Sequence, residues 1–195
     1  MAFRGRGPRG GAGVAGGLLA WTFTTEAPPA QPPLRVFVLS EGSLGFFGGL
    51  AVADQYCQTE GAALGAVAGE WKAWLSVGTQ SPSNRFSPKT IGTSRPFALV
   101  DGTIIANNWA DLTDGTLRHA IDKNASGQPA VAQVWTNTRP DGTTYEGEPL
   151  ACSGFTNLGG TPALIGHTDA VGSDWSNKSM LGCVNAAAFY CFEQA

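Results

Sequence analysis

The side chains with the most evident chemistry are four cysteines, Cys57, Cys152, Cys183 and Cys191. In an oxidising compartment they would form two disulfides, and otherwise they would be buried thiols or ligands of a metal ion. Four cysteines allow three pairings, and the sequence alone does not choose among them. We prefer the nested pairing, Cys57 with Cys191 and Cys152 with Cys183, because the crossed alternatives leave the segment between the inner two unanchored.

Metal and hydrolytic chemistry both have weak support. The chain has no Cys-x-x-Cys pair, and His119 and His167 lie at no ligand spacing, which disfavours zinc. Either histidine could be combined on paper with an Asp and a Ser. The Gly-x-Ser-x-Gly elbow and other nucleophile signatures are nevertheless absent, as are phosphate-cradling loops. We therefore expect a protein that is not an enzyme.

Residues 111–115, Asp-Leu-Thr-Asp-Gly, offer several oxygen ligands beside a glycine turn. A calcium-binding loop would need alternating Asp or Asn residues and a distal Glu, and both are missing. The segment therefore predicts a capped turn.

Composition limits the class of protein and its partners. A chain of 195 residues is long enough for one domain with a proper core plus an appendage. Only 14% of its residues are charged and 27 are glycine, against roughly 25% charged residues in ordinary soluble domains, which indicates a loop-rich extracellular protein. The net charge of -3 and the lack of a basic stripe disfavour nucleic-acid binding. No run of about 20 apolar residues predicts a membrane span.

Residues 1–33 differ from the rest of the chain. Arg4, Arg6 and Arg9 precede a weakly apolar run at 10–23, and a Pro-rich stretch follows at 27–33. The order basic then apolar is that of a secretion signal. The same composition is also typical of a flexible Gly/Arg arm that orders on a partner, and the residues favour neither alternative. The domain itself is expected at residues 34–195.

Hydrophobic patterns predict the elements of the first half of this domain. Residues 34–39 and 71–77 predict strands, and the run 50–64 predicts an amphipathic helix with Cys57 on its buried stripe. Residues 97–106 predict a hairpin, because two apolar runs flank the turn dipeptide Asp101-Gly102.

The second half carries fewer signals. Residues 107–117 predict an ordered loop pinned by apolar side chains, and residues 130–135 predict a strand. From there to Cys183 the chain is mostly Gly, Thr, Ser, Asn and Asp, which predicts a long loop region of about 50 residues that the inner cysteine pair would staple. Residues 186–192 predict a closing strand.

The order of these features resembles the C-type lectin-like fold. A closer likeness is to bacterial extracellular domains of uncharacterised function, related to the endostatin branch of that fold. The motifs that carry it are RVFV at 35–38, KAWLS at 72–76, LVDGT at 99–103, NNWADLTDGTL at 107–117, VWT at 134–136 and YCFE at 190–193. The resemblance implies an α+β fold with twisted antiparallel sheets, one or two helices and a long disulfide-stapled loop region. It implies the same nested cysteine pairing.

The resemblance also implies a ligand set. In C-type lectins, Glu-Pro-Asn and Trp-Asn-Asp triplets hold calcium and sugar hydroxyls. Here residues 148–150 are Glu-Pro-Leu and residues 175–177 are Trp-Ser-Asn, so a carbonyl ligand and a charge are lost. The implied ligand-binding residues are Glu148, Asp174, Trp175 and Asn177. Calcium is the one cofactor that they would take, and no other metal or cofactor is expected.

Tryptophan faces can stack on sugar rings. Of five candidates, we expect Trp71 or Trp74, Trp109 and Trp135 to be buried, and only Trp175 to be exposed. We predict a secreted or surface-displayed recognition module whose residues 135–183 contact a glycan or protein ligand. The alternative is an assembly or decoration subunit of a filament, envelope or virus particle, a homo-oligomer in which residues 1–33 lie on a neighbouring copy.

Overall fold

The structure describes most of the chain after the predicted N-terminal segment. The computed structural model describes residues 31–65, 70–130, 132–145 and 151–195. Residues 31–195 group into one compact unit, and most of the predicted segment 1–33 lies outside the described residues. Among the helices that are described, none is both long enough and apolar enough to cross a membrane.

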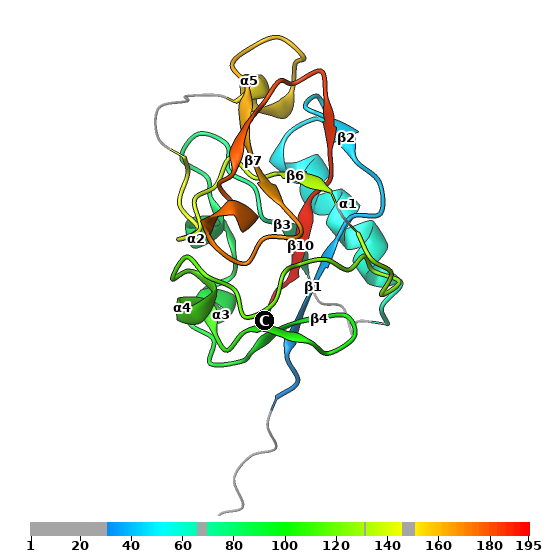
Figure 1. Ribbon diagram of the computed structural model, residues 1–195, viewed down its shortest axis with the longest axis vertical. Helices are drawn as coiled ribbons and strands as arrows, with labels where there is room; N and C mark the ends of the chain where they lie inside the picture. Colours follow the sequence, from blue (N-terminus) through cyan, green and yellow to red (C-terminus); the bar gives the residue numbers. More distant parts are fainter. Residues whose placement is uncertain (1–30, 66–69, 131, 146–150) are drawn as a thin grey trace, which may run out of the picture. The chain divides into compact units, whose positions relative to one another are not determined.

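The first strand of the domain lies at the centre of its main sheet. β1 (Leu34–Val38) pairs antiparallel with β10 (Tyr190–Glu193) on one side and parallel with β4 (Phe97–Leu99) on the other (Figure 1). Four of its five side chains are buried, as expected for a strand with packed layers on both faces. The predicted first and closing strands are therefore direct neighbours.

Two short strands complete this sheet at its edges, in the order β3-β10-β1-β4-β5. β3 (Trp71–Ala73) is the shortened form of the strand predicted at 71–77. β5 (Ile104–Ala106) returns antiparallel to β4 after the turn at Gly102, whose φ of 91° favours glycine. The predicted hairpin is confirmed.

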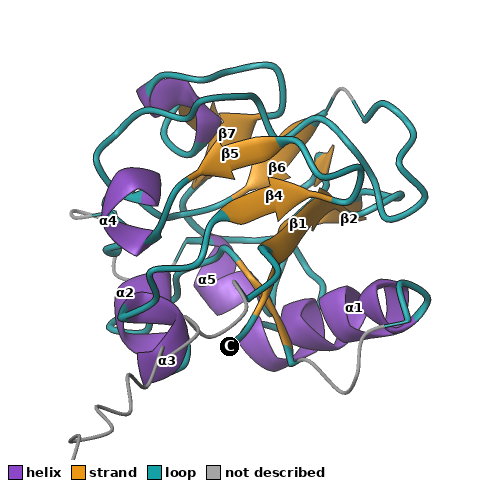
Figure 2. Cartoon of the chain, turned by 90° about the horizontal axis from the view of Figure 1, so that it is seen from below, coloured by secondary structure: helices purple, strands orange, loops and turns teal. Residues whose placement is uncertain are grey.

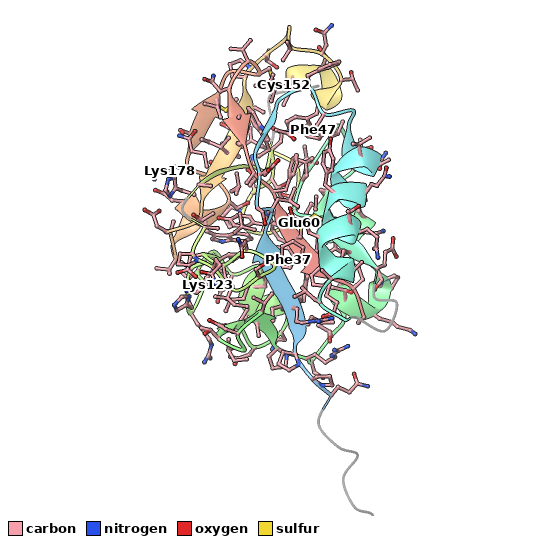
Figure 3. The ribbon with its side chains drawn as sticks, turned by 90° about the vertical axis from the view of Figure 1, so that its right-hand side faces the viewer. Phe37, Phe47, Glu60, Lys123, Cys152 and Lys178 are labelled. Carbon is pink, nitrogen blue, oxygen red and sulfur yellow. A yellow bond between two sulfur atoms is a disulfide. The ribbon has the colours of Figure 1, made fainter. Side chains whose placement is uncertain are left out.

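Helix α1 (Leu50–Ala62) lies along one face of the main sheet (Figure 2). Its buried residues Ala53, Cys57 and Gly61 form the predicted stripe. Cys57 is joined to Cys191 of β10 by a disulfide. Phe37 lies on the side of β1 that faces α1 (Figure 3). Gly61 leaves room for Trp71, because a Cβ at this position would come within 2.6 Å of three atoms of the indole.

Residues 136–183, predicted as a long loop region held by the inner cysteine pair, contain strands of a second sheet. β6 (Gln133–Trp135), β7 (Ala163–His167) and β8 (Ser179–Leu181) pair antiparallel in that order. A short 3-10 helix, η1 (Ser173–Trp175), connects the last two strands. The prediction was wrong because β7 is buried on both faces and is only five residues long, so it has no alternating pattern between its polar flanks.

The domain also contains several smaller elements. β2 (Ser43–Leu44) and β9 (Ala186–Ala187) form a two-stranded sheet. The short helices are α2 (Pro82–Arg85), α3 (Pro88–Ile91) and α4 (Trp109–Leu112). Asn108 caps α4 by accepting a hydrogen bond from the Asp111 backbone N–H. In the predicted capped turn at residues 111–115, Asp114 Oδ1 accepts a hydrogen bond of 2.9 Å from the Thr116 backbone N–H, and Gly115 has a φ of 102°.

The remaining element is a turn of unusual handedness. α5 (Cys152–Phe155) is a single helical turn, but all four of its residues have positive φ, from 47° to 70°. Such a left-handed turn costs about 1–2 kcal/mol for each residue that carries a Cβ. Cys152 is tied to Cys183 by the second disulfide, and Phe155 stacks on Phe47 with ring centroids 4.8 Å apart. These two anchors hold the turn in place.

The core is dominated by aromatic rings. Trp74 is fully buried, with ring centroids 4.9 Å from Trp175 and 5.4 Å from Phe192. Trp71, Trp74 and Trp135 are buried as predicted, whereas Trp109 is only partly buried. The described domain is thus an α+β protein with few helices, small sheets and two disulfides.

An ion pair joins β1 and β10, which are neighbours in the main sheet. The guanidinium of Arg35 donates from Nε and Nη2 to the two carboxylate oxygens of Glu193, at 2.9 Å each, and the Arg35 backbone N–H donates to the same carboxylate. Burial acts to raise the pKa of Glu193, but the hydrogen bonds from Arg35 outweigh it, so this pKa lies below its ordinary value. The carboxylate hydrogen bond raises the pKa of Arg35 in turn.

Candidate functional site

A groove of about 530 Å³ runs between helix α1 and the segment that follows β1. We call it the α1 groove. It is lined by Leu39, Ser40, Glu41, Gly42, Ser43, Tyr56, Thr59, Glu60, Ala63, Ala125 and Ser126. Its volume is that of a site for a small ligand.

The helix supplies one wall of the groove through its spacing. Tyr56, Thr59, Glu60 and Ala63 recur at intervals of three and four residues, so they share one face of the helical turn. That face lies next to the buried stripe that carries Cys57. The disulfide to Cys191 therefore fixes the position of this wall relative to the main sheet.

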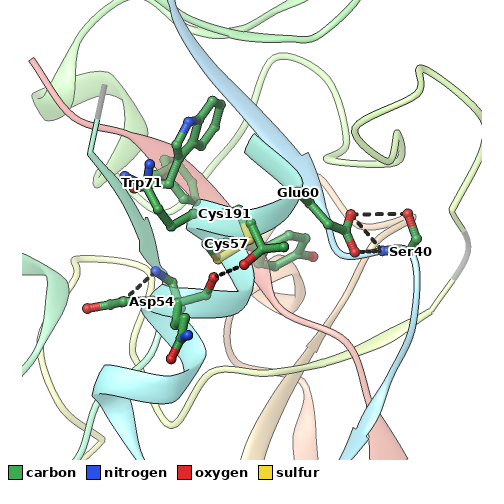
Figure 4. The surroundings of a disulfide bond; sticks show 12 residues. Ser40, Asp54, Cys57, Glu60, Trp71 and Cys191 are labelled. Carbon is green, nitrogen blue, oxygen red and sulfur yellow. Dashed lines mark hydrogen bonds between the residues drawn. A yellow bond between two sulfur atoms is a disulfide. The ribbon is translucent and has the colours of Figure 1, made fainter. Parts of the chain in front are cut away.

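Glu60 is held by the opposite wall. Its two carboxylate oxygens accept hydrogen bonds from the Ser40 backbone N–H at 3.1 and 3.2 Å, and the Ser40 hydroxyl lies 3.1 Å from Oε2 (Figure 4). A carboxylate has about four acceptor positions, so part of its capacity is left for a ligand. Glu60 is thus an acceptor whose position is fixed before a ligand arrives.

Tyr56 presents an aromatic face to the groove. Its side chain is 41% exposed, and its ring lies in a stacked arrangement on the buried Phe189, with centroids 6.4 Å apart and an interplanar angle of 21°. One face of the ring is therefore supported from beneath. An exposed, supported ring of this kind can pack on the apolar face of a ligand.

The charge of the groove is negative. Glu41 and Glu60 contribute two carboxylates, and the described lining contains no Lys, Arg or His. Neither carboxylate has a salt bridge within the described part of the chain. The groove can therefore accept neutral or cationic groups, and it repels anions.

The segment 39–43 is held at both ends. The Leu39 N–H donates to the carbonyl of Phe189 at 2.9 Å, and the indole N–H of Trp135 donates to the carbonyl of Ser43 at 2.8 Å. Between these points Gly42 lies close to Ala187, because a Cβ added to Gly42 would be 3.2 Å from the backbone of Ala187. This wall is consequently built on the sheet and not on a free loop.

Of the ligand-binding residues implied by the lectin resemblance, the three that the structure describes do not line the α1 groove and do not form one exposed site. Trp175 is fully buried against Trp74 and Tyr190, so the prediction that it is exposed is wrong. Its indole covers the core because β7 and β8 bring η1 down onto the main sheet. Asp174 is exposed and Asn177 is partly buried, while Glu148 lies outside the described residues.

The two histidines each lie close to a neighbouring residue in the chain. His167 Nδ1 lies 2.5 Å from Asp169 Oδ1, and His119 Nδ1 lies 2.8 Å from the carbonyl of Ala120. Neither histidine is hydrogen-bonded to a serine hydroxyl in the described residues. Across those same residues, no three His, Cys, Asp or Glu side chains are grouped so that they could hold a metal ion.

The residues of the α1 groove were not singled out from the sequence. A signal existed on the helix, because the aromatic and polar side chains of Tyr56, Thr59 and Glu60 lie at intervals of three and four residues on the face beside the buried stripe. The opposite wall had none, because Ser40 and Ser126 meet the helix only through the tertiary fold. No protein-family model matches the chain, and a search of curated proteins finds no match.

Proposed function

We propose that this chain is an extracellular recognition module with a C-type lectin-like fold, and that it binds a glycan in the α1 groove. It acts by surface complementarity and not by catalysis. The observation that carries the proposal is the exposed Tyr56 ring beside the Glu60 carboxylate, which Ser40 holds in place.

The finer fold assignment has support from connectivity. Cys57 of the helix is joined to Cys191 of the last strand, and Cys152 and Cys183 close the region between them. That nested pattern is the one that the lectin resemblance implies. The first and last strands also pair at the centre of the main sheet.

The chemistry of the groove supports a polyhydroxylated ligand. Sugar hydroxyls donate to carboxylates and accept from or donate to serine and threonine hydroxyls, all of which line the groove. The apolar face of a pyranose complements the Tyr56 ring. Strongly anionic ligands are disfavoured by Glu41 and Glu60.

The cysteines support the proposed location. Both disulfides are formed and the described chain has no free cysteine. Such bonds persist in oxidising compartments and are rare in the cytosol of most organisms. We therefore propose that the protein is secreted or surface-displayed and that residues 1–33 act in its export.

The test is direct titration with neutral glycans, by calorimetry on the intact protein. Tyr56→Ala should weaken binding by about tenfold or more, because the stacking face is lost, which corresponds to at least about 1.4 kcal/mol. Phe46→Ala is the matched control, since Phe46 is an exposed aromatic residue outside the groove lining. It should leave binding unchanged.

Two results would contradict this proposal. Full binding by Tyr56→Ala would place the site elsewhere, and lack of binding to any glycan in a broad panel would remove the ligand class. A chelator should have no effect, because the described lining of the α1 groove has two carboxylates and no group of three metal-binding side chains. Loss of binding on chelation would instead point to the lectin-type site around Glu148.

A further inference from the structure

A second hollow shares part of its lining with the α1 groove. This second hollow has a volume of about 440 Å³. It is lined by Leu39, Ser40, Gly42, Asn124, Pro129, Ala130, Ala132, Gln133, Ala186, Ala187 and Ala188. Leu39, Ser40 and Gly42 line both hollows, so the two adjoin along the segment after β1.

We infer that the ligand is a linear, uncharged glycan chain that lies along both hollows, and not a single terminal sugar. This inference rests on the proposed function. Each hollow alone has the size of a small-ligand site. A ligand that fills both must be extended and must pass over the shared wall at Ser40.

The second hollow offers neutral hydrogen-bonding groups. Gln133 is exposed, and its amide makes no hydrogen bond within the described residues. An amide both donates and accepts, which matches the hydroxyl groups of a sugar unit. Among the described residues that line this hollow, no side chain is charged.

The floor of the second hollow is shaped by small side chains. Five of its lining residues are alanine and one is glycine, so the backbone lies near the surface. Ala187 is at the same time the residue that Gly42 approaches closely. Gly42, which lines both hollows, therefore adds no side chain to the wall between them.

The outer wall of the second hollow is rigid. The Asn124 side-chain oxygen accepts hydrogen bonds from the backbone N–H groups of Ser126 and Gln128, at 3.0 Å each. The carbonyl of Lys123 accepts a bond of 2.8 Å from the Val38 N–H, which fixes this turn to β1. A preformed wall reduces the ordering cost of binding a flexible chain.

Charge sets the class of sugar. In the described lining, the first hollow has two carboxylates and the second has no charged side chain, so a uronate or sulfated unit would meet repulsion and no lining cation. Neutral units meet only hydrogen-bonding groups and the Tyr56 ring. The two hollows together favour a neutral polymer.

The experiment compares oligosaccharides of one to six units from neutral gluco-, manno-, xylo- and N-acetylchito-series, with oligogalacturonate as the acidic series. In the series that binds best, affinity should rise by about tenfold or more from the monosaccharide to the tetrasaccharide. Oligogalacturonate of equal length should bind at least about tenfold more weakly.

Two variants separate the hollows. Gln133→Ala should weaken tetrasaccharide binding by about threefold to tenfold and leave monosaccharide binding unchanged, whereas Tyr56→Ala should weaken both. Gln128→Ala is the matched control, because Gln128 is an exposed glutamine in the turn at residues 124–128 and lines neither hollow. Thermal unfolding followed by circular dichroism verifies that each variant is folded.

The outcomes distinguish this inference from the function on which it rests. Equal affinity for monosaccharide and tetrasaccharide, with binding still dependent on Tyr56, would overturn the extended ligand and leave the proposed function standing. An unchanged tetrasaccharide affinity in Gln133→Ala would do the same. If no neutral series binds, both the extended ligand and the glycan-binding function are wrong.

Discussion

The carboxylate of Glu193 links the first and last strands of the domain. Its carboxylate receives the Arg35 guanidinium and backbone N–H together, and the same guanidinium lies over the Trp71 ring, 5.5 Å from its centroid. Nη1 of Arg35 also donates to the carbonyl of Leu64, after helix α1. One partly buried pair therefore connects β1, β10 and the end of the helix.

This arrangement predicts a defined pH dependence. A carboxylate with a lowered pKa in the folded state contributes stability that is present above its unfolded pKa and is lost as the pH falls through the folded pKa. We expect the free energy of unfolding to fall as the pH drops below about 4.5. Glu193→Gln should be less stable by about 1–3 kcal/mol at pH 7, and the difference should shrink toward pH 3.

Urea unfolding of both proteins at pH 7, 5, 4 and 3 measures the effect. Glu70→Gln is the control, because Glu70 pairs with Lys72 at the surface with 64% of its side chain exposed. That change should alter stability by less than about 1 kcal/mol at every pH. A difference between Glu193→Gln and the native protein that does not vary with pH would contradict the role given to this charge.

At the scale of elements, α5 is the least expected part of the molecule. Its four residues are all left-handed, and three of them carry side chains. Such conformations persist only where the surroundings determine them. Here the disulfide of Cys152, the packing of Phe155 and the hydrogen bonds from Gly48 and Gly49 to the Phe155 carbonyl do so.

Backbone conformation predicts opposite effects for glycine substitutions in α5 and before η1. Gly154→Ala should lower the free energy of unfolding by about 1–2 kcal/mol, because alanine is strained at a φ of 70°. Gly172→Ala should raise it by about 0.4–1 kcal/mol, because φ there is -84° and a Cβ would meet no atom within 4 Å. Chemical denaturation gives both values. A neutral Gly154→Ala would mean that the turn is right-handed.

Some elements could be predicted and others could not, for physical reasons. The Asp101-Gly102 turn and the stripe around Cys57 are local patterns, and both were found where expected. β7 was missed because its burial on both faces removes the alternation that marks a strand. Trp175 was misplaced because its polar neighbours suggested a surface loop, whereas its own ring fills the core.

Local sequence patterns could not predict the candidate site, for a related reason. Tyr56 and Glu60 lie on a predicted helix face, but the groove exists only where that face meets Ser40 and Ser126. Those contacts depend on how β1 is placed in the sheet and on the turn after Lys123. Sequence patterns describe neither.

For the molecule as a whole, the two disulfides should differ in their contribution to stability. They close loops with sequence separations of 134 and 31 residues. By loop-closure entropy, the outer bond contributes about 5 kcal/mol and the inner bond about 4 kcal/mol, as upper values. The outer value is comparable with the net stability of a typical domain.

We therefore expect the double substitution Cys57→Ala with Cys191→Ala to destabilise the domain more than Cys152→Ala with Cys183→Ala. All four side chains are almost fully buried, so the loss of packing is similar in the two pairs. Urea unfolding of each double variant without reductant measures the comparison. An inner pair that costs as much as the outer pair would show that local anchoring of α5 outweighs loop length.

The central position of β1 between β4 and β10 has a consequence for biosynthesis. The chain is made from its N-terminus, so β1 and Cys57 emerge long before the strand and the cysteine that complete them. Cys152 emerges earlier than Cys191, and it is an available wrong partner for Cys57 during that interval. Maturation should therefore depend on disulfide exchange after synthesis, and not on oxidation in order of appearance.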